Sequence, residues 1–535
     1  MKKKESLWDK YCSFYEKDFD EQVEYNRKRR DEFFERWKKT KTAGLLLPKG
    51  SDSFEDVPIT TYNDYTFLHK FGIQMEKKTA NNPKPDGMSW KEYYERMSVG
   101  LKDWIADYLP GEYGVPVKTT GTTGRPKWFA VGKKFIKEFG EEMMSTIIFA
   151  CSDDRGETKI DRGDIVLNMG IPIPYLGGYT YRAWGREFTM FPSIQFTDEE
   201  LNMKAKLRYI LKKIKHGQEI HCATGVASTF YLFGQTIVKP EKVYEDYYKT
   251  SNFGIKKMIG YLLYQKEKLK KNKVQRVKDV LPIKGSVTSG IDTMLYKDYI
   301  TYHFGSPPLN AYGSTELGMV MMGRTDRKLD LVPNLRLRYV EFVDLEGNIH
   351  AIDDLKKGRV YQLIGTPFDT PLIRYDQKDL LLLKEFRDDG MPIFTFEGRK
   401  ESWLNLNGYF YLTEGIAFHV MKKAGFENDA NWAVTKKVHP DERLYFLYEK
   451  NLDEGELTKK LYSGLYEISE DFRRYVDDFD IKKPSEIIEV EKLSRGSFKR
   501  YAMKQMNKDI PIGQYKSPKI ISPEDKEIVE NLRTA

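Results

Sequence analysis

The most informative part of the sequence is Thr119-Thr120-Gly121-Thr122-Thr123-Gly124-Arg125-Pro126-Lys127. Its two glycines permit tight turns and a close approach of the backbone to a ligand. Its four threonines supply hydroxyl donors, and successive backbone amides in such a loop can form a concave nest for anions. Arg125 and Lys127 add positive charge. The pattern predicts a loop that binds a polyphosphate, although a purely structural turn can have the same composition.

The spacing of residues 119–127 differs from that of the two common phosphate-binding patterns. A Walker A loop has four residues between its first glycine and a Gly-Lys-Ser/Thr triplet, and a dinucleotide-binding loop has the form GxGxxG. Neither form fits this stretch. The sequence therefore indicates a phosphate loop of a different kind.

Length and composition predict a large globular protein. The chain has 535 residues, of which 40% are hydrophobic and 14% aromatic, enough for two or three domains with sizeable cores. The net charge of +8 is the small difference between 88 basic and 80 acidic residues, so it suits small anionic ligands without requiring nucleic acid. Cys12, Cys151 and Cys222 form no CxxC pair, and neither a zinc site nor a disulfide framework is expected.

The sequence carries no signal for secretion or for a membrane span. No apolar segment follows the lysines at residues 2–4, so no secretory signal is predicted. No run of about 18 apolar residues occurs. We expect a cytoplasmic protein with neither a membrane nor a nucleic acid as partner.

Hydrophobic periodicity predicts an α/β chain. Residues 6–41 place aromatic side chains three and four positions apart, which predicts a helix packed on the body. Between residues 57 and 396, helical patterns alternate with β-rich runs such as 164–168 and 360–364, which is typical of a domain with parallel sheet. Residues 260–280 predict a lysine-rich helix, whose charged face is either simply solvated or steers phosphates.

Residues 119–127 strongly resemble the phosphate-binding motif of the adenylate-forming superfamily, which includes acyl- and aryl-CoA synthetases, luciferases and peptide-synthetase adenylation domains. That motif reads Ser/Thr-Ser/Thr-Gly-Thr-Thr-Gly-x-Pro-Lys, and each fixed position is matched. The resemblance extends from about residue 58 to residue 504. It implies that the loop binds ATP through Thr119, Thr120, Gly121, Thr122, Thr123, Gly124 and Lys127.

A second motif, Ala311-Tyr312-Gly313-Ser314-Thr315-Glu316, resembles the family's Tyr-Gly-x-Thr-Glu. Its Gly-Ser turn lets the backbone approach a nucleotide, which assigns Gly313 and Ser314 to the nucleotide site. The resemblance implies that Tyr312 stacks on adenine, Thr315 donates to the α-phosphate and Glu316 binds phosphate-bound Mg²⁺, which prefers hard oxygen ligands. The alternative is a capped helix start.

An upstream loop, Thr288-Ser289-Gly290-Ile291-Asp292, lies where the family lines its adenine pocket. The resemblance implies that Ser289, Gly290 and Ile291 contact the nucleotide. The longer segment 287–316 particularly resembles the acyl-acid amido synthetase branch, the plant hormone-conjugating enzymes.

A third motif, residues 371–380 (PLIRYDQKDL), resembles the PLIRYxxxDL of phenylacetate-CoA ligases. In the family the final aspartate holds both ribose hydroxyls, which assigns that role to Asp379. A carboxylate can accept two hydroxyl hydrogen bonds at once, so the residue type is suitable. The alternative is an ion pair of Asp379 with Arg374 or Lys378.

Two later motifs resemble the family's hinge and its C-terminal lysine loop. Glu397-Gly398-Arg399 resembles the Gly-Arg that opens the hinge, although Ser402 stands where an Asp or Lys is usual, and Arg399 would contact ribose or phosphate. Ser494-Arg495-Gly496-Ser497-Phe498-Lys499-Arg500 resembles the lysine loop, which makes Lys499 the expected catalytic lysine and Lys504 its rival. An ammonium on a flexible stem can bridge the carboxylate and the α-phosphate.

The resemblance implies a two-domain α/β fold. Residues 1–397 would form a large multi-subdomain N-terminal domain with mixed and parallel sheets, beginning with a helical extension over residues 1–41. Residues 398–535 would form a small, mobile α+β lid. The implied activity is adenylation of a carboxylic acid by ATP and Mg²⁺, with Lys499, Thr315 and Glu316 as catalytic residues.

The sequence indicates less clearly which carboxylic acid is activated and which acceptor receives the acyl group. Transfer of the acyl group to CoA is preferred over transfer to an amine, and a nucleotide-binding regulator without catalysis or an unrelated scaffold is less favoured. Residues 168–184 and 221–233 fall where the family builds its carboxylate pocket. Tyr175, Tyr179 and Tyr181 suit an aromatic or apolar acid, but they suit a protein core as well.

Overall fold

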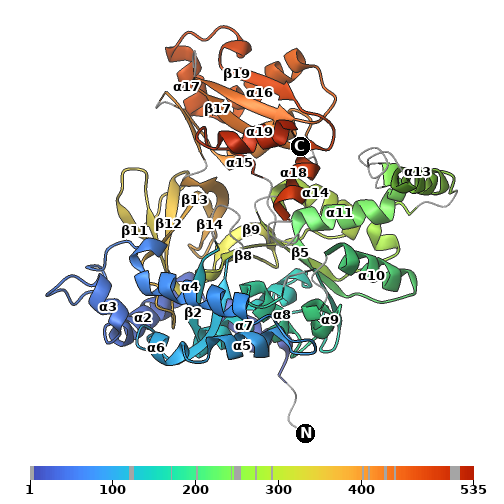
Figure 1. Cartoon of the computed structure of the whole chain (residues 1–535). Coiled ribbons are helices and arrows are strands. Elements are labelled where there is room, and N and C mark those ends of the chain that lie inside the picture. The colour runs from blue at the N-terminus through green and yellow to red at the C-terminus, as the bar shows by residue number, and fades with distance from the viewer. Residues whose placement is uncertain are drawn as a thin grey trace.

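The fold was analysed in a computed structural model of the chain. It describes residues 5–119, 126–169, 172–199, 203–241, 244–245, 255–270, 274–290, 293–400, 403–407, 410–426, 431–438, 442–506 and 518–534. A large mixed sheet with helices packed on it lies beside a smaller C-terminal sheet domain (Figure 1), so the expected α/β class is confirmed. Within these ranges each helix is too short or too polar to cross a membrane.

The first part of the chain is helical and packs on the body, as Trp8 does in edge-on contact with Phe149. The prediction of one continuous helix over residues 6–41 was wrong. The backbone is extended at Lys17 and Asp18, and Asp18 is the N-cap of a separate helix, α2. The elements are α1 (Leu7–Cys12), η1 (Ser13–Glu16), α2 (Phe19–Trp37), α3 (Lys41–Leu46), η2 (Tyr62–Asp64), α4 (Thr66–Asn81), α5 (Trp90–Ser98) and α6 (Lys102–Ala106).

The large sheet has twelve strands among the described residues, in the order β11-β10-β12-β13-β14-β9-β8-β7-β6-β5-β3-β4. Its parallel half is β3 (Ile165–Asn168), β4 (Thr189–Phe191), β5 (Cys222–Val226), β6 (Gly285–Ser289) and β7 (Leu309–Ser314). Its antiparallel half continues with β8 (Gly318–Arg324), β9 (Arg327–Pro333), β10 (Arg338–Val343), β11 (Ile349–Ala351), β12 (Val360–Pro367), β13 (Tyr375–Phe386) and β14 (Pro392–Arg399). The strands expected at residues 164–168 and 360–364 are confirmed.

Helices connect the parallel strands, as the alternating pattern predicted. The lysine-rich helix expected over residues 260–280 ends earlier, at Lys268. The connecting elements are α7 (Lys133–Ala150), α8 (Leu176–Trp184), α9 (Ile194–Glu199), α10 (Met203–Lys215), α11 (Ala227–Val238), α13 (Ile255–Lys268), η3 (Val277–Asp279) and α14 (Thr293–Phe304). Before α7, β1 (Tyr113–Lys118) and β2 (Trp128–Gly132) form a separate antiparallel hairpin.

The C-terminal part has its own sheet and its own buried clusters, one centred on Trp432 and Phe446 and one on Tyr445 and Phe498. In Figure 1 it lies above the large sheet, in orange and red. Its elements are β15 (Leu404–Leu406), β16 (Phe410–Leu412), α15 (Glu414–Lys423), β17 (Trp432–Lys437), β18 (Arg443–Tyr448), α16 (Glu454–Ile468), α17 (Glu470–Asp478), η5 (Pro484–Glu486), β19 (Ile488–Lys492), α18 (Ser497–Met506) and α19 (Lys526–Thr534).

A buried ion pair fixes α7 against the middle of the large sheet. Arg338 and Glu142 have no exposed side-chain surface, and Arg338 Nη2 lies 2.5 Å from Glu142 Oε2. Arg338 also donates from Nε to the carbonyl oxygen of Leu317 at 2.8 Å. That carbonyl belongs to the turn directly after Glu316, so this ion pair helps to position the second motif.

We predict that Glu142→Ala lowers the free energy of unfolding of the N-terminal part by about 3–5 kcal/mol, because it leaves the Arg338 guanidinium buried without its counter-charge. The matched control is Glu141→Ala on the same helix. Glu141 pairs with Arg336 at 2.9 Å with partly exposed side chains, and its loss should cost less than about 1 kcal/mol. Denaturant unfolding followed by tryptophan fluorescence measures both, and equal losses would contradict the prediction.

Candidate active site

The parallel half of the sheet delivers several predicted segments to one edge. β3, β5, β6 and β7 end there at Asn168, Val226, Ser289 and Ser314, and Ser289 is in register with both Val226 and Ala311. Gly290, with φ of +106°, follows Ser289. Ligands of open α/β sheets bind outside the carboxyl ends of the strands, so this edge is where a site is expected. Ile291 lies outside the described residues.

The base of the predicted phosphate loop is closed by two hydrogen bonds. Thr119 N donates to the Lys127 carbonyl oxygen at 2.9 Å, and Lys127 N donates to Thr119 Oγ1 at 2.8 Å. These bonds continue the β1–β2 hairpin, so the loop is its tip. The residues between, Thr120, Gly121, Thr122, Thr123 and Gly124 with Arg125, lie outside the described residues.

The second motif forms a strand, a turn and a second strand. Tyr312, Gly313 and Ser314 end β7, residues 315–317 turn, and β8 returns antiparallel. Ser314 Oγ accepts a hydrogen bond from Leu317 N at 3.0 Å, which closes the turn. The alternative of a capped helix start was therefore wrong. A Cβ atom at position 313 would lie 2.5 Å from the Gly318 carbonyl oxygen, so only glycine fits there.

Asp379 joins three of the predicted motifs. Its side chain is buried, with Oδ2 2.5 Å from the Tyr312 hydroxyl and Oδ1 3.0 Å from Arg399 Nε. The pairing follows from strand register, because Asp379 on β13 stands opposite Arg399 on β14. Burial and the Asp379 carboxylate raise the pKa of the Tyr312 phenol well above its usual value, so Tyr312 remains a hydrogen-bond donor to that carboxylate.

The Tyr312 ring packs against Phe396, with ring centroids 5.4 Å apart. Its hydroxyl is engaged with Asp379. The structure thus shows Tyr312 hydrogen-bonded to Asp379, and stacking of Tyr312 on adenine stays a prediction.

Glu316 lies near the same group, in the turn after β7. Burial raises the pKa of its carboxyl group, while the charges of Lys127 and Arg399 act in the opposite direction. Burial lowers the pKa of Arg399, but Asp379 and Glu316 outweigh this effect, and the pKa of the guanidinium is raised. The structure therefore brings together Lys127, Tyr312, Glu316, Asp379 and Arg399, here called the carboxylate cluster, from four separate motifs.

Two tyrosines near Glu316 were missed in the sequence. The Tyr62 ring lies 5.2 Å from the Lys127 ammonium group, and burial, with a contribution from the Glu316 charge, raises the pKa of its phenol to about 12. Burial and Glu316 also raise the pKa of Tyr375. Tyr375 lies within the third motif, so its place in that motif could have marked it as a candidate site residue. Tyr62 lies in a single 3-10 turn, which gives no periodicity to detect.

Arg374, also in the third motif, makes a structural contact. Arg374 forms a buried, bidentate ion pair with Glu341, and both N–O distances are 3.0 Å. Its Nη1 atom also donates to the Val57 carbonyl oxygen. The predicted alternative, in which Asp379 pairs with Arg374 or Lys378, was therefore wrong about the partner, which is Arg399.

Lys499 belongs to the C-terminal part, where its exposed side chain extends from the first turn of α18. The carboxylate of Glu449 holds that turn, because it accepts from Gly496 N at 2.9 Å and from Phe498 N at 2.6 Å. A carboxylate bound to the first amides of a helix is a favourable arrangement. The rival Lys504 donates to Asn531 Oδ1 on α19 at 3.0 Å.

The three tyrosines proposed for the acid pocket are not equivalent. Tyr179 and Tyr181 are buried in the main hydrophobic cluster, and the Tyr179 hydroxyl donates to the Pro116 carbonyl oxygen at 3.1 Å. Tyr175 precedes α8 and is partly exposed. Within the described ranges no cluster of three or more His, Cys, Asp or Glu residues could hold a metal ion by itself. Mg²⁺ that binds between phosphates and one carboxylate needs no such cluster.

Glu397 marks the passage to the C-terminal part. A register shift between Leu380 and Leu381 leaves Glu397 as the extra residue of a bulge in β14. Its carboxyl group accepts from Thr395 Oγ1 and from Thr413 Oγ1, both at 3.3 Å, and Thr413 is the N-cap of α15. Burial raises the pKa of Glu397 to about 7. A second contact between the two parts is the ion pair of Lys422 with Asp298 at 2.8 Å.

Comparison with known proteins identifies the fold. No protein-family model and no curated protein sequence matches the chain. AtGH3.15 acyl acid amido synthetase in complex with 2,4-DB matches with a TM-score of 0.64 and 14% identity, over 99% of this chain and 95% of that one. 2-Hydroxyisobutyryl-CoA ligase in the postadenylation state, in complex with 2-HIB-AMP, matches with a TM-score of 0.52 and 14% identity, over 100% and 97%.

These likenesses cover nearly the whole chain, but at this identity they establish the fold alone. The chain has the fold of the adenylate-forming enzymes, and the resemblance seen in its motifs is confirmed at that level.

We predict that the contact between β14 and α15 weakens as the pH rises. The carboxyl group of Glu397 has a pKa of about 7 in the folded protein and 4.5 as its ordinary value, so raising the pH from 4.5 to 7 ionises the unfolded state first. Between these values folding is progressively destabilised. Glu397→Gln, which keeps hydrogen-bonding atoms without ionising, should flatten this dependence in thermal unfolding at pH 5 to 8. The exposed Glu346→Gln is the control, and equal slopes for all three proteins would refute the prediction.

Proposed function

We propose that the chain is an ATP-dependent ligase that converts a carboxylic acid to an acyl-adenylate and releases pyrophosphate. The observation that carries this proposal is the carboxylate cluster, in which Lys127, Tyr312, Glu316, Asp379 and Arg399 lie near one another. Lys127 also closes the base of the predicted phosphate loop. A fold shared with enzymes of this class supports it, and so does the order of the motifs.

The residues of the carboxylate cluster fit a nucleoside triphosphate such as ATP. Asp379 presents a buried carboxylate beside Tyr312 and Arg399, and carboxylate oxygens are suitable acceptors for ribose hydroxyls. Lys127 and Arg399 supply positive charge for phosphate oxygens. Glu316 is the oxygen ligand that would hold Mg²⁺, and the ion would supply further neutralisation of phosphate charge.

The reaction proposed for this site is an in-line displacement. A carboxylate oxygen of the acid attacks the α-phosphorus atom, the bond to the bridging oxygen breaks, and pyrophosphate leaves with the bonding electrons. The protein's part is to place the two reactants and to neutralise the charge that develops on the phosphate oxygens. Thr315, in the turn beside Glu316, would donate to the α-phosphate, and Lys499 would bridge the attacking carboxylate and that phosphate.

We propose that residues 398–535 act as a lid on residues 1–397. Lys499 lies on this part, so catalysis by Lys499 requires the C-terminal part to bring α18 to the carboxylate cluster. Among the described residues, α15 contacts the N-terminal part through the hydrogen bond of Thr413 with Glu397, the ion pair of Lys422 with Asp298 and the packing of Phe418 against a buried cluster. A rearrangement between half-reactions would have to exchange these contacts.

Two acceptors are proposed for the second half-reaction. CoA is favoured by the similarity of residues 371–380 to phenylacetate-CoA ligases. An amine is favoured by residues 287–316, and the two matching structures with the higher TM-scores, 0.64 and 0.62, are acyl acid amido synthetases. Formation of a thioester or of an amide from a preformed acyl-adenylate, with each acceptor offered separately, distinguishes them.

We predict that Asp379→Ala weakens ATP binding by at least about 100-fold, because it removes two hydrogen bonds from ribose hydroxyls to a charged group, each of which contributes about 1.5–3 kcal/mol. The matched control is Asp376→Ala on the same strand. The Asp376 carboxylate accepts from Gln362 Nε2 at 2.7 Å and lies outside the carboxylate cluster. Calorimetric titration with ATP measures both affinities. An unchanged dissociation constant for Asp379→Ala would remove Asp379 from the ribose site.

We predict that Lys499→Ala lowers the rate of pyrophosphate release at least about 100-fold while the ATP dissociation constant changes little, because its ammonium group acts on charge that develops in the transition state. Lys504→Ala is the matched control on the same helix, since Lys504 is bonded to Asn531, and it should retain most of the activity. If Lys504→Ala lost activity and Lys499→Ala retained it, Lys504 would be the catalytic lysine.

A further inference from the structure

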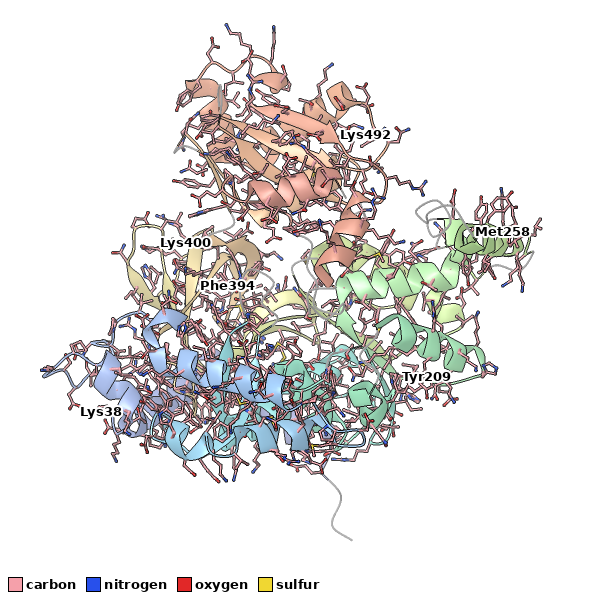
Figure 2. The ribbon with its side chains drawn as sticks, viewed as in Figure 1. Lys38, Tyr209, Met258, Phe394, Lys400 and Lys492 are labelled. Atoms are coloured by element: carbon pink, nitrogen blue, oxygen red, sulfur yellow. The ribbon has the colours of Figure 1, made fainter. Side chains whose placement is uncertain are left out.

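The helix α13 (Ile255–Lys268) carries apolar side chains on its outer surface. Figure 1 shows it projecting beyond α11 at the edge of the molecule, and Met258 is labelled on it in Figure 2. Met258 and Leu262 are each 58% exposed, and Leu269, directly after the helix, is 78% exposed. Ile259 and Tyr261 are exposed as well. Neighbouring apolar side chains that are each about half exposed or more, gathered on one short helix, are typical of a binding surface.

These side chains share one face of the helix. At about 100° per residue, Met258 and Leu262 lie about 40° apart, and Ile259 and Tyr261 lie on either side of them. On the remaining surface of the helix, Gly260 is buried and Leu263 and Tyr264 are partly buried. The apolar stripe of Met258, Ile259, Tyr261 and Leu262 therefore faces away from the protein.

The stripe is accompanied by positive charge. Residues 255–270 contain five lysines and one glutamate, Glu267. Lys266, Lys268 and Lys270 are exposed, and the Glu267 carboxylate is paired with Lys270 at 2.7 Å. A helix with an exposed apolar stripe and a strong lysine excess has the pattern of helices that lie in a membrane interface.

We propose that α13 is an interfacial helix that binds this protein reversibly to an anionic phospholipid surface. The apolar stripe would enter the boundary between headgroups and acyl chains, and the lysines would contact the acidic headgroups. A helix of 14 residues is too short to span the bilayer, in agreement with the absence of a spanning helix among the described residues.

An anionic lipid surface fits this helix better than other occupants. A second copy of the chain would bring its own lysines against these lysines, which opposes pairing of two α13 helices. A neutral apolar groove would match the stripe but not the charge. The proposal departs from the expectation that the chain has no membrane partner, because the sequence pattern could not show which face of this helix is exposed.

The test uses the full chain and vesicles of phosphatidylcholine with or without phosphatidylserine, separated by sedimentation at low and at physiological salt. Binding to the anionic vesicles, with about a fivefold loss of affinity per exposed lysine replaced, is expected. The double variant Ile259→Ser with Leu262→Ser should lose at least about tenfold in affinity, and the triple variant Lys266→Glu with Lys268→Glu and Lys270→Glu at least about 100-fold.

Matched controls are Leu345→Ser, 65% exposed, and Lys482→Glu, both distant from α13, and neither should change binding. The variants should keep the circular dichroism spectrum and thermal unfolding midpoint of the unchanged protein, which shows that they fold and keeps this test independent of the proposed activity. Absence of sedimentation with anionic vesicles, or equal binding by all variants, would overturn the proposal. So would dimerisation of the chain that the serine variant abolishes, since the stripe would then bind a second copy.

Discussion

The candidate site depends on one buried carboxylate, that of Asp379. A buried charge is stable only when it is paired and hydrogen-bonded, and here Tyr312 and Arg399 provide both conditions. Tyr312 lies on β7, the last parallel strand, whereas Arg399 ends the antiparallel strand β14, so Asp379 connects the two halves of the large sheet. The same carboxylate holds Arg399, which belongs to the motif predicted to open the hinge. The groups that would surround a nucleotide are therefore held in place in advance, as electrostatic catalysis requires.

The sequence was sufficient to predict the fold class and all five members of the carboxylate cluster, because each lies in one of four short motifs. Their pairing could not be predicted. Asp379 has Arg374 and Lys378 as closer neighbours in sequence, but the register of β13 with β14 places Arg399 opposite it. Arg374, with a positive φ of 43°, instead turns towards Glu341. Long-range register is a property of the whole sheet, so a local motif does not contain it.

The features that the sequence missed have a similar origin. Tyr62 reaches Lys127 from a single turn without periodicity, and Glu397 is placed by a bulge that arises where two strands change register. The N-terminal helix was predicted as continuous because aromatic spacing persists across its break, and only the extended backbone at Lys17 and Asp18 reveals the interruption. The exposure of the α13 stripe likewise depends on which face the rest of the protein leaves uncovered.

The central claim is that this chain activates a carboxylic acid with ATP, and isotope exchange between pyrophosphate and ATP tests it most directly. The assay needs only the protein, MgATP, labelled pyrophosphate and one acid at a time from a panel of aryl, fatty and amino acids, without any acceptor. The account predicts exchange that depends on the presence of one class of acid. Measurable ATP binding with no exchange for any acid in the panel would contradict it, and would favour a protein that binds the nucleotide without adenylation.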